Sequence, residues 1–162
     1  MKTLYLLRHA KSSWDDPDLD DFDRPLNERG EKDAPKMGKR LKEREIVLDI
    51  FYSSPAARAI ATAKTVARII GFPVANIQSE RKLYHADDET LMDVLRGASD
   101  KSDSIMIAGH NPGLTDFTNL LQSEIIDNIP TTGVVGIKFK ITSWKDVKAK
   151  SGKLVFFDFP RR

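Results

Sequence analysis

Apolar and polar residues follow two patterns along the chain, one typical of strands and one typical of helices. Short, mostly apolar runs predict strands, and those at residues 3–7 and 104–108 indicate buried strands. Longer segments carry apolar residues three or four positions apart, as in a helix with one buried face. The predicted strands are 3–7, 49–52, 74–78, 104–108, 134–141 and 154–159. The predicted helices are 31–43, 56–70, 89–98 and 114–121.

The order of these segments predicts the fold class. Strands and helices alternate as far as residue 121, which favours an α/β three-layer sandwich with helices on both faces of a mostly parallel central sheet. No helix-length segment separates the last two strands, so we expect an antiparallel edge. Ligands of such sheets bind beyond the carboxyl ends of the strands, and the residues that follow each strand are therefore the candidates for chemistry.

Composition narrows the range of functions. The 162 residues, 40% of them hydrophobic, suit a single folded domain, and a net charge of +2 predicts no nucleic-acid partner. The absence of cysteine excludes disulfides, thiolate metal sites and cysteine nucleophiles. The three histidines are His9, His85 and His110, and a three-histidine metal site would need all of them; we expect no metal or other cofactor. We see neither a signal peptide nor an apolar run near the ~18 residues of a membrane span, and expect a cytoplasmic protein without a membrane partner.

Three predicted strands are followed by cationic or ionisable residues. Arg8 and His9 follow the first strand, Arg58 lies in the first turn of the helix after the second, and His110 follows the strand at 104–108. Each of these side chains, taken alone, suits a solvated or hydrogen-bonded loop position. Together at one edge of a parallel sheet, they predict an anion site.

The chemistry of these residue types suits a phosphoryl group. Arginine matches phosphate oxygens in a bidentate manner, and helices that begin near Ala56 and Gly113 would add backbone donors. An imidazole with a pKa near 6.5 is largely neutral at pH 7 and can attack phosphorus. A backbone carbonyl that accepts the proton of one ring nitrogen would leave the other free as nucleophile. Hydrolysis would then proceed in two transfers through a phosphohistidine.

Three ordered blocks of sequence resemble the histidine phosphatase superfamily, also called phosphoglycerate-mutase-like. The blocks are Arg8-His9-Ala10, Ser54-Pro55 with Arg58-Ala59, and Gly109-His110-Asn111-Pro112. The short length and similarity along almost the whole chain resemble most closely the SixA-type phosphohistidine phosphatases. The resemblance implies a phosphoglycerate-mutase-like fold and one histidine-phosphatase domain over residues 1–162.

The same resemblance implies roles for individual residues. His9 would be the nucleophile, with Arg8, Arg58 and His110 as the phosphate pocket. Arg24 resembles a further phosphate-contacting arginine, and an ion pair with the neighbouring aspartates is its alternative role. The activity implied is that of a metal-independent phosphatase that hydrolyses phosphohistidine on a phosphorelay-type protein, its partner, through phospho-His9.

The proton donor is left open by the sequence. Larger members of the superfamily supply a carboxylate from the region that here contains Glu80, Asp87, Asp88 and Glu89, and Asp88 or Glu89 also suits a helix cap. His85 is either a further donor or a packed or exposed side chain. Because imidazole leaves more readily than a serine alkoxide, an undefined acid favours phosphohistidine as substrate.

Two other functions are compatible with these residues. The same mechanism could serve a small phosphate ester or a mutase reaction, and a non-catalytic module could bind phosphorylated partners. Binding needs the cations but no nucleophile, so the presence of His9 favours an enzyme.

The six aspartates between residues 15 and 23 lack the glycine and glutamate of a calcium loop. We expect a solvated loop there, whose charge would repel small polyanions.

Overall fold

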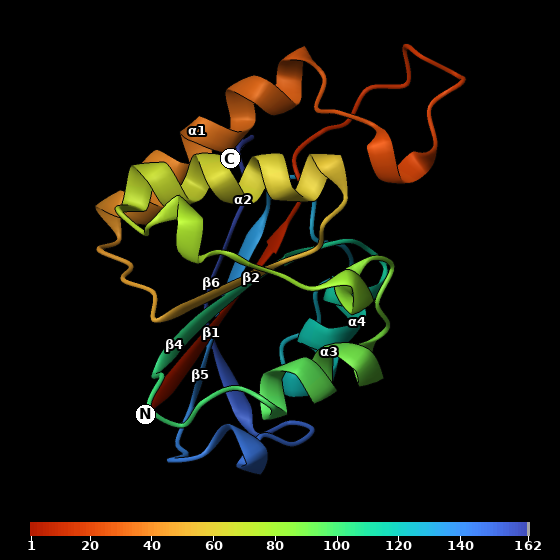
Figure 1. Ribbon diagram of the computed structural model, residues 1–162. Helices are drawn as coiled ribbons and strands as arrows, with labels where there is room; N and C mark the ends of the chain where they lie inside the picture. The colour runs from red at the N-terminus through yellow and green to blue at the C-terminus, as the bar shows by residue number, and fades with distance from the viewer. Residues whose placement is uncertain (162) are drawn as a thin grey trace.

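The computed structural model, which describes residues 1–161, has a six-stranded sheet with helices on both faces (Figure 1). The strands are β1 (Lys2–Arg8), β2 (Ile50–Ser53), β3 (Gln78–Ser79), β4 (Ser104–Gly109), β5 (Val134–Phe139) and β6 (Gly152–Asp158). The α-helices are α1 (Glu28–Glu43), α2 (Ala57–Ile70), α3 (Asp88–Arg96) and α4 (Gly113–Leu121). Short 3-10 helices are η1 (Asp21–Asp23), η2 (Val74–Asn76), η3 (Arg81–Leu83) and η4 (Trp144–Asp146). Within residues 1–161, every helix is too short or too polar to cross a membrane.

The strands lie in the order β3-β2-β4-β1-β5-β6. Strands β1 to β4 pair in parallel, whereas β5 runs antiparallel to both β1 and β6. The predicted fold class and its antiparallel edge are thereby confirmed. Because β4 lies between β1 and β2, the three strands that precede the candidate residues end side by side.

Two apolar clusters, one on each face, hold the three layers together. Helices α1 and α2 cover one face, where they bury Leu7 and Phe51, and α3 and α4 cover the other, where they bury Leu6 and Ile107. Figure 1 shows the two helix pairs on opposite sides of the sheet. Neighbouring residues of β1 enter opposite clusters, as the two-residue period of a strand requires. Burial on both faces explains why β1 and β4 are nearly continuous apolar runs.

The strand predicted at residues 74–78 has the wrong bounds, because only Gln78 of that range lies in a strand, β3. Val74–Asn76 form the 3-10 turn η2, in which the Asn76 N–H donates to the carbonyl of Pro73. Only β3 pairs with the sheet in this region, at the edge of β2. The ring of Pro73 fixes a φ angle that suits a turn, and the apolar side chains here cover the α1–α2 cluster instead of forming a ladder.

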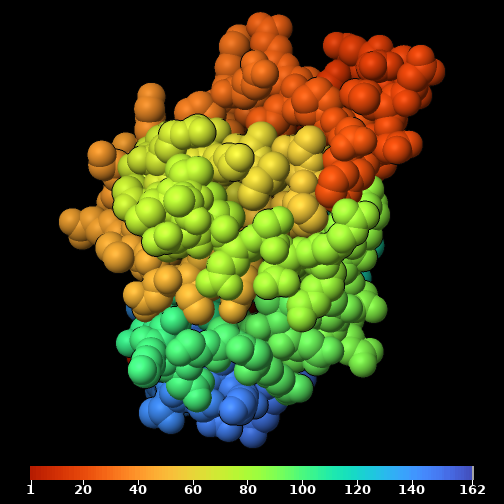
Figure 2. Space-filling model, in the orientation of Figure 1, coloured from red at the N-terminus to blue at the C-terminus, as the bar shows by residue number. Residues whose placement is uncertain are grey.

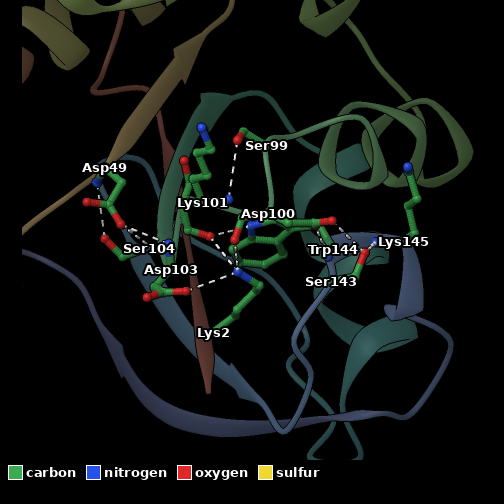
Figure 3. A network of polar contacts seen from close by, with 11 residues as sticks. Lys2, Asp49, Ser99, Asp100, Lys101, Asp103, Ser104, Ser143, Trp144 and Lys145 are labelled. Atoms are coloured by element: carbon green, nitrogen blue, oxygen red, sulfur yellow. Dashed lines mark hydrogen bonds and ion pairs between the residues drawn. The ribbon is translucent and has the colours of Figure 1, made fainter.

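The amino end of the sheet is closed by a polar network (Figure 3). The buried Lys2 ammonium donates to the carbonyls of Asp100 and Ser102, both at 2.8 Å, and pairs with Asp103 at 3.0 Å. It also lies 5.4 Å from the ring centroid of Trp144, whose Nε1 donates to Ser102. Its three donors are thus satisfied, so the network ties β1 to the loop before β4 and to η4.

Candidate active site

The loops after β1, β2 and β4 meet at the carboxyl edge of the sheet. The His9 N–H donates to the Gly109 carbonyl at 3.1 Å, and the Ser54 N–H donates to the Ala108 carbonyl at 2.9 Å. These bonds extend the parallel ladder past the ends of the strands. The structure therefore brings the residues after β1, β2 and β4 together, as the sequence predicted.

His9 is a buried imidazole whose orientation is fixed. Its side chain is 8% exposed, and Nδ1 lies 2.8 Å from the carbonyl oxygen of Ala10. A carbonyl can only accept, so Nδ1 must carry the proton, which leaves the lone pair on Nε2. The Ala10 N–H in turn donates to Thr62 Oγ1 on α2, which holds the turn in place. His9 thus has the tautomer that a nucleophilic Nε2 requires.

His110 lies beside His9 and is also buried. The two ring centroids are 5.1 Å apart, and His110 Nε2 lies 2.8 Å from the hydroxyl of Ser54. That hydroxyl already accepts from the Ala56 N–H, so its own proton can be donated to Nε2. In that tautomer His110 Nδ1 carries a hydrogen and can donate to an anion.

The four buried side-chain nitrogen or oxygen atoms without a hydrogen-bond partner in residues 1–161 all lie at this edge. They are Arg8 Nε, Arg58 Nε, His110 Nδ1 and Thr132 Oγ1. Buried polar atoms normally have partners, and each unpaired one costs free energy. Two of the four are arginine N–H donors. Hydrogen-bond donors gathered at the carboxyl edge of a parallel sheet suit an oxyanion such as phosphate.

The two imidazoles are held neutral. Burial is the main cause that lowers the pKa of His9 to about 4, and the charges of Arg58, Arg8 and Arg24 add to it against the opposing hydrogen bond to Ala10. Burial and the neighbouring His9 and Arg58 lower the pKa of His110 to about 3. A neutral His9 at pH 7 keeps its lone pair available to phosphorus.

Asp21, in the acidic loop, joins the arginines of the site. Its carboxylate pairs with Arg58 at 2.9 Å and with Arg24 at 3.2 Å, and its carbonyl accepts from Arg58 Nη1 at 2.6 Å. Burial opposes its ionisation, but hydrogen bonds from Tyr84, Arg58 and Arg24 outweigh that effect and hold its pKa well below the usual range. Figure 2 shows the red lobe formed by the segment after β1 meeting the green segment before α3.

The sequence did not identify Asp21 as a site residue. The other aspartates between residues 15 and 23 are exposed, as expected for a solvated loop. Arg24 forms the ion pair that was the alternative to a phosphate contact, and its guanidinium lies 3.5 Å from the ring centroid of the exposed Trp14. Nothing local distinguishes Asp21 from its neighbours, since its partners Arg58 and Tyr84 are 37 and 63 residues away.

The region expected to hold a carboxylic acid contributes something else. Asp87 is the N-cap of α3 and accepts from the Thr90 N–H at 2.8 Å, so the prediction of Asp88 or Glu89 as the cap is wrong. The physical reason is that the capping geometry needs an extended residue before the first turn, and Asp88 and Glu89 are already helical. His85 instead reaches the site and lies 3.2 Å from Asp21.

No group of three or more histidine or acidic side chains that could hold a metal ion occurs in residues 1–161. The residues gathered at the edge are cationic or neutral apart from Asp21. Fold and site together define an α/β protein in which unpaired arginine and histidine donors surround a buried, oriented imidazole. That combination is typical of phosphoryl transfer through histidine.

The comparison with known proteins agrees with this class. Residues 4–86 match the model of the histidine phosphatase superfamily, branch 1. An uncharacterized chloroplastic protein of Arabidopsis thaliana is 34% identical over 93% of this chain and 72% of its own. The chain belongs to the histidine phosphatase superfamily, and this membership supports a phosphatase activity.

Solved structures give the same fold. One, assigned as the phosphohistidine phosphatase SixA of Agrobacterium tumefaciens, is 28% identical, with a TM-score of 0.83 over 98% of each chain. Another, the protein histidine phosphatase SixA in complex with tungstate, has a TM-score of 0.84 at 18% identity, over 98% of this chain and 97% of that one. The phosphoglycerate-mutase-like fold and the SixA-type resemblance are thus confirmed.

Proposed function

We propose that this protein is a metal-independent phosphohistidine phosphatase that works through a covalent phospho-His9 intermediate. One observation carries the proposal: His9 presents an unprotonated Nε2 at the sheet edge that also holds the unpaired donors of Arg8, Arg58 and His110. A nucleophile, a fixed tautomer and cationic donors are what in-line phosphoryl transfer to histidine requires.

The proposed reaction has two balanced steps. In the first, the lone pair of His9 Nε2 forms a bond to phosphorus as the bond to the substrate nitrogen breaks, and that nitrogen takes up a proton. In phospho-His9, Nδ1 keeps its proton and donates it in a hydrogen bond to the Ala10 carbonyl. In the second, water attacks phosphorus, the His9–phosphorus bond breaks, and phosphate leaves. Arg8, Arg58 and His110 stabilise the charge on the equatorial oxygens in both steps.

Two arguments favour phosphohistidine as the substrate. The Agrobacterium tumefaciens relative, at 28% identity over nearly its whole length, is assigned to that activity. Imidazole also leaves phosphorus more readily than an alkoxide, which suits a site where Asp87 caps α3 and Asp21 is paired with Arg58. The partner we propose is a phosphotransfer protein that carries phosphohistidine, and the cytoplasmic location remains a prediction.

The test measures phosphate release from a phosphotransfer domain that carries phosphohistidine. A phosphoserine peptide serves as the comparison substrate, and a chelator is present throughout. Wild-type protein should release phosphate from the first substrate much faster than from the second, and His9→Ala should release none. Lys64→Ala, which removes an exposed cation from α2, is the matched control and should retain full activity. Equal rates on both substrates would move the assignment to small esters. Phosphopeptide binding without turnover would indicate a binding module.

A further inference from the structure

The three histidines of the chain form one cluster. The His85 ring centroid lies 5.4 Å from that of His110, which lies 5.1 Å from that of His9. The mechanism proposed above uses His9 and His110 but leaves His85 without a role. The neighbouring Tyr84 ring lies 4.0 Å from His85, so the ring is held on one side by an aromatic contact.

The backbone at His85 has an unusual conformation. Its φ angle is 55°, in the left-handed region that residues other than glycine rarely adopt. Such strain persists only where the surroundings impose it, and it is concentrated at functional sites. Here the next residue is clamped: a Cβ added at Gly113 would lie 1.9 Å from the carbonyl oxygen of Ala86. The loop therefore packs directly against the first residue of α4.

Asp21 connects His85 to the phosphate pocket. His85 Nε2 lies 3.2 Å from Asp21 Oδ2, the oxygen that also accepts from Tyr84 at 2.6 Å and from Arg58 at 2.9 Å. A carboxylate at this position accepts the Nε2 proton of His85 and thereby orients the ring. Asp21, Tyr84 and His110 contact the His85 ring, and Asp87 and Asp116 line the same cavity as His85. In residues 1–161 Asp21 is the one ion-pair partner of His85.

His85 is the most exposed of the three clustered histidines, as a residue that meets a departing group must be. The His85 side chain is 56% exposed, whereas His9 and His110 are buried beneath it. In-line transfer places the leaving atom opposite the nucleophile, toward solvent. Among the candidate donors, Asp87 and Asp88 use their carboxylates on the N–H groups of α3. Glu89 is exposed on α3, and neither its carboxylate nor that of Glu80 has a hydrogen bond or ion pair in residues 1–161. His85 contacts both Asp21 and His110, and its Nδ1 has no hydrogen bond in the same residues.

We infer that His85, oriented by Asp21, is the acid–base residue of the reaction, a role that rests on the proposed function. In the first step the imidazolium of His85 gives a proton to the departing nitrogen or oxygen as the bond from His9 to phosphorus forms. In the second step neutral His85 takes a proton from the attacking water as phospho-His9 breaks down. His85 is charged again at the end of the cycle, so protons balance. Asp21 acts through His85 and is a positioning residue.

The test compares leaving groups that differ in their need for a proton. Phenyl phosphate and p-nitrophenyl phosphate are reacted under single-turnover conditions with wild type, His85→Gln, Lys82→Gln and His9→Ala. We expect His85→Gln to slow the phenyl ester about 100-fold, the usual size of a general-acid contribution, and the p-nitrophenyl ester less than about threefold. Lys82→Gln, which changes an exposed residue of η3, should match wild type on both.

Chemical rescue adds a second readout. Free imidazole should restore the phenyl phosphate rate of His85→Ala and leave that of His9→Ala unchanged. Equal slowing of both esters by His85→Gln, without rescue of His85→Ala, would assign His85 a structural role and overturn the inference. Full activity of His9→Ala would overturn the proposed function itself, so the two failures are distinguishable.

Discussion

Lowering the pH tests whether burial keeps the His9 imidazole neutral and therefore nucleophilic. With the pKa of His9 at about 4, the imidazole is about 90% neutral at pH 5. An exposed histidine with a pKa near 6.5 would be only about 3% neutral at that pH. Burial in the pocket therefore predicts a nucleophile that stays competent some two pH units below the usual range.

The same shift links pH to stability. The folded pKa of His9 lies below its unfolded value, so the unfolded chain binds more protons and is favoured by acid. The free energy of unfolding is therefore not reduced by His9 above about pH 6.5, and it falls as the pH is lowered toward 4. One such group accounts for about 2 kcal/mol between pH 7 and pH 5, from the proton linkage of the two pKa values. His110, shifted in the same direction, adds to this loss.

Imidazole NMR measures these quantities directly, because the chain has only three histidines. We expect the His9 signals to show the Nδ1–H tautomer and to stay neutral at pH 5, with assignments from single His→Gln variants. Urea unfolding at pH 7 and pH 5 should show a smaller loss of stability in His9→Gln than in wild type. A His9 ring that titrates between pH 6 and 7, or that carries its proton on Nε2, would refute the reasoning.

Three further predictions test other parts of the structure. Arg58→Lys should weaken inhibition by tungstate or inorganic phosphate about tenfold or more, measured as an inhibition constant, because an ammonium cannot replace the planar donor array of a guanidinium; unchanged inhibition would remove Arg58 from the pocket. Gly113→Ala places a Cβ 1.9 Å from the Ala86 carbonyl oxygen, and urea unfolding should show a loss of about 1–3 kcal/mol. Lys2→Met leaves the acceptors of the Lys2 ammonium unpaired and should lower stability by about 1–3 kcal/mol at unchanged kcat, whereas a drop in kcat with intact folding would contradict a purely structural network.

Sequence periodicity predicted most of the fold because the two faces of the sheet are buried. The runs at β1 and β4 and the spaced apolar residues of α1 and α2 record that burial directly. The apolar residues after Phe72 predicted a strand, but they form a turn at Pro73 that has no hydrogen-bonded partner strand. Such a turn can also bury apolar side chains. Periodicity records burial, and it cannot distinguish burial in a strand from burial in a turn.

The convergence of residues that follow strands was predicted, whereas Asp21, in a loop, was missed and the position of His85 was left open. Arg8, His9 and His110 end strands that are adjacent by topology, so their convergence follows from the sheet. Asp21 and His85 come together across two loops, through a contact between residues 64 positions apart in sequence that no spacing rule contains. Their roles depend on side-chain geometry, and only the three-dimensional structure shows that all three histidines are neighbours.

The most direct test of the central claim is to identify the atom that receives the phosphoryl group. Wild-type protein is mixed with a phosphohistidine phosphotransfer domain labelled at phosphorus, quenched within one turnover in base, and mapped by mass spectrometry. The account predicts one base-stable, acid-labile phosphoryl group on His9, absent in His9→Ala. Rapid phosphate release with no label on His9 at any time, or label on another residue, would contradict it.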